Sequence, residues 1–101
     1  MSALAILAAA TLYCTATLPD GERSRFLLLP KRDTVEMVTG DGTFYVFRRN
    51  KIMSDAKYQV AAAQLTGEIR SSLMIDDKLR TQQTFVMHGA RPVFVYGRCR
   101  K

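Results

Sequence analysis

The two cysteines are the residues with the most specific chemistry in this chain. Cys14 lies in the first strand-like run, and Cys99 lies near the end of the 101-residue sequence, inside a basic tail. A disulfide between them would staple the first strand to the last, as is typical of small domains in oxidising compartments. In the loop-entropy model, closing a loop of roughly 85 residues contributes ~4.5 kcal/mol. Two free thiols are the alternative, which a cytosolic location would favour.

No other set of residues predicts a catalytic or metal centre. The single histidine, His88, stands in a Gly-Ala turn signal, so we expect a solvated turn residue rather than a general base. The adjacent Asp76 and Asp77 point in different directions in a strand or turn, unlike a general acid and base pair. A closed zinc site needs four Cys or His ligands, but the chain has one histidine and two cysteines. We therefore expect no enzyme, no cofactor and no metal.

The excess of basic over acidic residues is the feature that suggests a class of partner. Fifteen Lys and Arg against nine Asp and Glu give a formal charge of +6, which favours anionic partners. A closed sheet could bring the cationic clusters, Arg23 with Arg25 among them, into one patch, and Tyr45 and Phe47 beside Arg48 could form a stacking platform for single-stranded nucleic acid. A merely solvated surface is the alternative, and charge alone favours it. The candidate binding residues are Tyr45, Arg48, Arg49, Lys51, Ser54, Arg98 and Arg100.

Alternating apolar and polar residues between turn signals predict the elements that must position these side chains. Leu12, Cys14 and Ala16 share one face of the first strand, and Gly40-Asp41-Gly42 predicts a hairpin turn rather than a phosphate-binding loop. For the segment 49–57, the sequence leaves two alternatives, an edge strand or one turn of helix. The alanine-rich segment 58–65 favours a strand over a helix. The expected strands are 12–18, 24–29, 34–39, 43–48, 58–65, 68–75, 81–87 and 93–99.

These strands predict an all-β fold, a small antiparallel meander that closes into a barrel. Pairing the first strand with the last would remove the exposed edges that invite aggregation. The length and the 48% apolar composition fit one globular domain, residues 11–101.

The segment 1–10 is apolar and ends in small residues, so it is a candidate signal segment. A retained N-terminal helix of alanine and leucine is the alternative. The apolar run is interrupted by Thr11 and Cys14 and is shorter than the ~20 residues of a membrane span. Export to the periplasm or secretion is therefore favoured, with a cytoplasmic location as the alternative.

Two features resemble a known family. The sequence has Tyr13-Cys14 near its start, with no residue between the tyrosine and the cysteine, Cys99 near its end, and Ser54-Asp55-Ala56-Lys57-Tyr58 between them. Small periplasmic inhibitors of c-type lysozyme are similar: they are disulfide-containing, eight-stranded barrels with a Tyr-x-Cys start and a Ser-Gly-x-x-Tyr loop. The resemblance implies that Ser54 would insert into the lysozyme cleft. The family's Trp and Lys-Gly motif has no counterpart here, since the chain has no Trp.

Three functional hypotheses follow. The leading one is an exported, non-enzymatic barrel with a basic face that binds an acidic protein or an anionic cell-envelope surface. The second is a phage-encoded nucleic-acid-binding or virion-associated protein that stays in the cytoplasm. The third is a c-type lysozyme inhibitor.

The intact mass of the protein from a secretion-competent host separates export from cytoplasmic retention. We expect a mass that lacks the N-terminal segment, with both cysteines resistant to alkylation until they are reduced. A full-length mass with two reactive thiols would contradict export and favour the cytoplasmic hypothesis.

Overall fold

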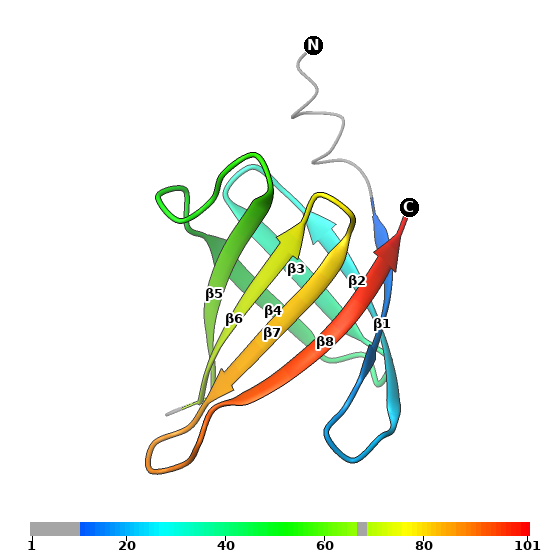
Figure 1. Ribbon diagram of the computed structural model, residues 1–101, viewed down its shortest axis with the longest axis vertical. Helices are drawn as coiled ribbons and strands as arrows, with labels where there is room; N and C mark the ends of the chain where they lie inside the picture. The colour runs from blue at the N-terminus through cyan, green and yellow to red at the C-terminus, as the bar shows by residue number, and fades with distance from the viewer. Residues whose placement is uncertain (1–10, 67–68) are drawn as a thin grey trace.

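The described residues form a closed antiparallel β-barrel (Figure 1). The computed structural model describes residues 11–66 and 69–101, so the candidate signal segment 1–10 lies outside the described residues. Each strand pairs with its neighbours in chain order, and β1 closes the barrel against β8. The predicted all-β meander and its closure are confirmed. The strands are β1 (Leu12–Thr17), β2 (Arg23–Pro30), β3 (Thr34–Thr39), β4 (Phe44–Arg49), β5 (Tyr58–Thr66), β6 (Ile69–Asp76), β7 (Arg80–Val86) and β8 (Val93–Arg100).

The barrel has two mouths. The start of β1, the end of β8 and the β2–β3, β4–β5 and β6–β7 connections lie at one end, here called the upper mouth (Figure 1). The β1–β2, β3–β4 and β7–β8 connections lie at the other end, the lower mouth. No helix among the described residues is long and apolar enough to cross a membrane.

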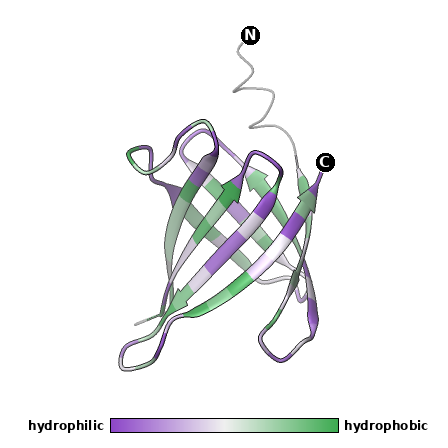
Figure 2. Ribbon diagram, viewed as in Figure 1, coloured by the Kyte–Doolittle hydropathy of each residue, from purple (hydrophilic) through white to green (hydrophobic). Residues whose placement is uncertain are grey.

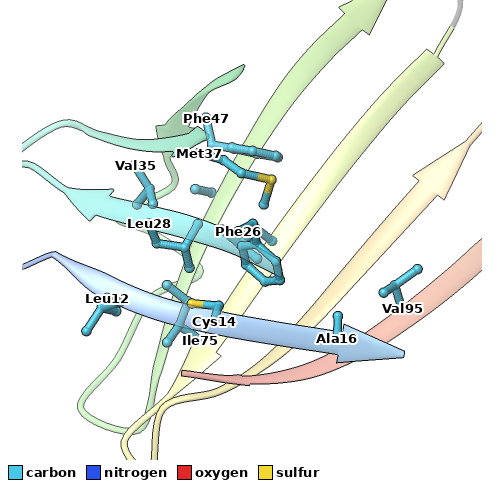
Figure 3. Close-up of a cluster of buried hydrophobic side chains, with 12 residues drawn as sticks. Leu12, Cys14, Ala16, Phe26, Leu28, Val35, Met37, Phe47, Ile75 and Val95 are labelled. Atoms are coloured by element: carbon cyan, nitrogen blue, oxygen red, sulfur yellow. The ribbon is translucent and has the colours of Figure 1, made fainter. Parts of the chain in front are cut away.

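Strand alternation fills the interior with apolar side chains. Leu28 and Phe47 are fully buried, and Val35 and Leu73 are nearly so. Figure 2 shows hydrophobic and hydrophilic residues alternating along the strands, and Figure 3 shows side chains of β1, β2 and β3 gathered inside the barrel. An eight-stranded barrel is just wide enough for its side chains to fill it. The middle of the barrel is therefore a packed core and not a channel.

The disulfide closes the seam between β1 and β8. Cys14 and Cys99 face each other in the strand register, with 4.0 Å between their Cα atoms, and they form a bond across a sequence separation of 85. Cys14 is buried and Cys99 packs against the core, so the bond faces the interior. This confirms the predicted staple.

Gly97 allows the seam strands to approach each other closely. A Cβ atom at this position would lie 2.6 Å from the carbonyl oxygen of Thr15 and 2.7 Å from Oγ1 of Thr81. Backbone and a neighbouring strand would both have to move to accommodate it. Glycine is thus required by space on the inner face of β8, two residues before Cys99.

The Gly40-Asp41-Gly42 segment is a hairpin turn, as predicted. Gly42 has a φ of +87°, which residues with a Cβ rarely adopt. The Asp41 carboxylate accepts hydrogen bonds from the Thr39 hydroxyl and from the Thr43 amide, at 3.0 Å for the amide. These bonds, led by the Thr39 hydroxyl, lower the pKa of Asp41 to about 2.

The β4–β5 connection differs from both alternatives considered for segment 49–57. Residues Lys51 to Met53 form a turn in which the Asn50 side chain accepts hydrogen bonds from the amides of Ile52 and Met53, at 3.1 and 3.2 Å. These bonds satisfy the two amides within the turn, and the chain continues through Ser54 and Asp55 without forming a strand or a helix. The predicted edge strand or helical turn is therefore wrong, whereas the predicted strand over 58–65 is confirmed by β5.

Replacing both cysteines tests the contribution of the staple. We expect Cys14→Ala/Cys99→Ala to lower the free energy of unfolding by about 2–5 kcal/mol, because the unfolded chain regains the entropy of a long open loop. Denaturant unfolding under oxidising conditions measures the change. Reduced wild-type protein is the control and should unfold at nearly the same midpoint as the double variant. An unchanged midpoint in the oxidised double variant would show that the disulfide does not stabilise the barrel.

A candidate basic interface on the barrel wall

The structure separates the predicted binding residues into three places. Arg98 and Arg100 occupy exposed positions on β8, whereas Arg48 is exposed on β4, on the opposite side of the closed strand order. Lys51 and Ser54 lie in the β4–β5 connection at the upper mouth. The basic clusters on β4 and β8 therefore do not form one continuous patch, because closing the barrel places these two strands on opposite sides.

The predicted stacking platform is also wrong. Phe47 is 0% exposed and Tyr45 packs against the same core, while Arg48 points to solvent. Successive side chains of a strand point to opposite faces of the sheet. Tyr45 and Phe47 therefore share the inner face of β4, where no nucleobase can reach Phe47.

A set of five arginines gathers instead on the outer face of the strands around the seam. The strand register places Arg80 beside Arg98, Arg98 beside Thr15, and Thr15 beside Arg25. Neighbouring strands are about 4.8 Å apart, so Arg98 and Arg25 stand about 10 Å from each other. This surface, which we call the arginine wall, contains Arg23, Arg25, Arg80, Arg98 and Arg100.

Two exposed tyrosines stand among these arginines. Tyr13 is 49% exposed and Tyr96 is 61% exposed, and both lie on the outer face of the seam strands. The guanidinium carbon of Arg100 lies 5.3 Å from the centroid of the Tyr13 ring, within the range of a cation–π interaction. The wall thus offers flat aromatic surface together with positive charge.

Two shallow hollows on the wall share Thr15. One has a volume of about 360 Å³ and is bordered by Arg23, Arg80 and Arg98. The other has a volume of about 540 Å³ and is bordered by Arg25 and Arg100. Thr15 is the short residue between longer neighbours on β2 and β8, so partner side chains have room beside it.

Most of the positive charge on the wall is uncompensated. Among ion pairs within the described residues, only Arg80 of the five arginines takes part, with 2.7 Å between its Nε and Oδ2 of Asp76. Oδ1 of Asp76 also accepts hydrogen bonds from the amides of Lys78 and Arg80, and the Arg80 amide is the first cause that lowers the pKa of Asp76. Asp76 is therefore the last residue of β6, and its side chain organises the turn at Asp77 and Lys78 that follows, whereas the sequence predicted a turn from Asp76 onward.

Arg23 and Arg25 are visible in the sequence only as one of the basic clusters, and Arg80, Tyr13 and Tyr96 were not predicted as site residues. Arg80, Arg98 and Arg25 are far apart in the sequence and meet only through strand pairing. The alternation along each strand could have identified these arginines as outward-facing, because each one stands at an exposed position between buried or half-buried neighbours.

The arginine wall can recognise anions. Each guanidinium presents a rigid fork of N–H groups that matches a carboxylate or phosphate. Metal binding is not indicated, since no group of three or more His, Cys, Asp or Glu in the described part of the chain could hold a metal ion.

No protein-family model, curated protein or solved structure matches this chain. The functional proposal therefore rests on the geometry of the site.

Ser54 holds its own loop together. Its hydroxyl donates a hydrogen bond to the Asn50 carbonyl at 2.7 Å and accepts one from the Val60 amide at 3.0 Å. The neighbouring Asp55 carboxylate accepts hydrogen bonds from the amides of Lys57 and Tyr58. Insertion of Ser54 into another protein's cleft would therefore require these two bonds of the hydroxyl to be broken.

The Ser54→Ala variant tests whether Ser54 stabilises its own loop or inserts into the cleft of lysozyme. We expect a loss of about 1–2 kcal/mol in the free energy of unfolding, because the Val60 amide loses its acceptor. Thermal or denaturant unfolding measures it, with Ser72→Ala on β6 as the matched control. The lysozyme-inhibitor hypothesis predicts, in addition, that wild-type protein blocks cell-wall lysis by c-type lysozyme and that Ser54→Ala does not. Unimpeded lysis with excess wild-type protein would rule that hypothesis out.

Proposed function

We propose that this protein is a non-enzymatic binding module that holds an acidic protein surface against the arginine wall. The observation that carries the proposal is the set of four arginines on one wall that form no ion pair within the described residues, beside two exposed tyrosines. These four guanidinium groups are therefore free to form ion pairs with a binding partner.

The composition of the wall favours a protein as the partner. Tyrosine and arginine are enriched among the residues that dominate protein–protein binding, since they combine large contact area with directed hydrogen bonds. The wall is broad, with hollows that are shallow, which suits a protein surface better than a small ligand. Carboxylates of an acidic partner would take the bidentate bonds that the guanidinium forks offer.

The disulfide supports a location outside the cytosol. Structural disulfides persist in oxidising compartments and are rare where glutathione and thioredoxin keep thiols reduced. The Cys14–Cys99 bond joins β1 and β8, the two strands between the arginines of β2 and the arginine of β7. An exported protein, in the periplasm or secreted, is therefore part of the proposal.

Charge reversal on the wall tests the proposal. We expect Arg25→Glu/Arg98→Glu to weaken binding to an acidic polypeptide, poly-L-glutamate, by at least about tenfold at low salt, because two direct ion pairs become repulsive. Titration calorimetry or fluorescence anisotropy measures the affinity. Binding of the wild-type protein should fall steeply between about 50 and 300 mM salt, as screening requires.

The matched control is Arg48→Glu/Arg70→Glu, which changes the net charge equally at exposed positions on β4 and β6. We expect this variant to lose at most about twofold. Equal losses in the two variants would show that only net charge matters and would overturn the wall as a site. A single-stranded oligonucleotide or an anionic lipid vesicle that binds more tightly than the polypeptide, with the same Arg25/Arg98 dependence, would replace the acidic protein by that partner.

A further inference from the structure

The upper mouth of the barrel contains a pocket that the arginine wall does not use. Its volume is about 580 Å³, which lies in the range of small-molecule sites. Its lining residues come from the β2–β3, β4–β5 and β6–β7 connections, at the mouth where β1 begins and β8 ends (Figure 1). The residues that border it include Leu12, Arg49, Lys57, Ile75, Leu79 and Lys101.

The floor of this pocket is apolar. Leu12 and Ile75 are 5% and 7% exposed and belong to the core, and Leu79 packs against them. Leu28 and Phe47 are fully buried in the core next to this layer. A ligand in the mouth would therefore cover a shallow apolar floor and could not thread a long chain into the barrel.

The rim of the pocket is mainly cationic. Lys31, Arg49, Lys57, Lys78 and Lys101 border it, against the acids Asp76 and Asp77. Asp76 is already engaged by the Arg80 side chain and by two turn amides. Among the ion pairs of the described residues, Lys31 with Glu36 is the only one that involves a cation of this rim.

Arg49 is the most constrained of these cations. Its Nε donates to the Lys31 carbonyl and its Nη1 donates to Oε1 of Gln59, both at 2.7 Å. These bonds tie the start of the β2–β3 connection to β5 and hold the guanidinium at the rim. A guanidinium has five N–H donors, so two bonds leave donors for a ligand.

Arg49 is also a partly buried cation without a carboxylate in contact. Burial is the first cause that lowers the pKa of Arg49, and the more distant charge of Asp33 opposes that shift. Asp33 itself pairs with Lys51 at 3.0 Å, and the Lys51 bond lowers the pKa of Asp33. An anion in the pocket would offset the cost of withdrawing Arg49 from water.

We infer that the upper mouth binds a small carboxylate with a compact apolar body, such as a short-chain or aromatic acid. The carboxylate meets Arg49, with Lys57 and Lys101 adding charge from the rim. The apolar body covers Leu12, Ile75 and Leu79. This site is distinct from the arginine wall, and its ligand is too small to be the partner proposed for that wall.

The experiment uses the full-length protein and the fluorescent aromatic anion 8-anilinonaphthalene-1-sulfonate as the probe. We expect saturable binding that octanoate displaces, while octylamine and inorganic phosphate displace the probe poorly, because the site needs both a negative head and an apolar body. Octyl phosphate, run in parallel, shows whether the head group must be a carboxylate. Methyl NMR signals of Leu12, Ile75 and Leu79 should shift as octanoate is added.

Neighbouring residues on β4 supply the matched variants. We expect Arg49→Gln to weaken octanoate binding about tenfold, as loss of a charged hydrogen bond implies, and Arg48→Gln to leave it unchanged. Because Arg49 also ties two elements together, Lys57→Gln/Lys101→Gln is the second variant, with an expected loss of about fivefold. The charge-reversed wall variant Arg25→Glu/Arg98→Glu should bind octanoate as the wild type does.

Three outcomes would overturn the inference. The first is no saturable displacement by octanoate, and the second is equal affinity in wild type, Arg49→Gln and Lys57→Gln/Lys101→Gln. The third is ligand-induced shifts confined to Tyr13 and its neighbours on the outer wall. Should Arg49→Gln fail to fold, the lysine variant decides between the outcomes.

Discussion

The pairing of β1 with β8 is the constraint on which the rest of this structure depends. A meander of eight strands has two free edges, and each would expose a row of unpaired amides and carbonyls. Pairing from Tyr13 with Arg100 to Thr17 with Tyr96 removes both edges at once. The chain secures this pairing in two ways: the disulfide fixes the register at Cys14 and Cys99, and Gly97 gives the backbones space to approach. The closed sheet of eight strands then surrounds the core.

The same seam creates the candidate interface. Arg98 and Arg100 come from the end of the chain and Arg23 and Arg25 from its second strand, and only closure brings them to one surface. Opening the seam would therefore scatter the charge as well as expose the edges. The stability of the barrel and the geometry of the candidate interface therefore depend on the same row of hydrogen bonds between β1 and β8. The pocket at the upper mouth depends on closure in the same way, since Leu12 and Lys101 reach it from the two ends of the chain.

Most of the fold could be predicted from the sequence because each strand carries its own alternation. Cys14, Leu73 and Val95 all face inward at the parity that the pattern indicates. The site could be predicted only in part. Arg98 and Arg100 lie on the wall, but Arg48 lies opposite to them, and Phe47 is buried because it has the inward parity on β4. Arg80 and the mouth pocket arise from pairings between distant segments, and the hydrogen bonds of Ser54 depend on how its loop folds back on β5. None of these is visible from the spacing of residues along the chain.

The position of the disulfide also determines how the molecule responds to mechanical force. β1 begins and β8 ends at the upper mouth, on neighbouring antiparallel strands. A force that pulls these ends apart peels β1 from β8 one pair at a time, first separating Tyr13 from Arg100, and then meets the covalent bond between Cys14 and Cys99. The residues between the two cysteines carry no load as long as that bond is intact. In the oxidised protein, the distance between the start of β1 and the end of β8 therefore stays nearly constant under load.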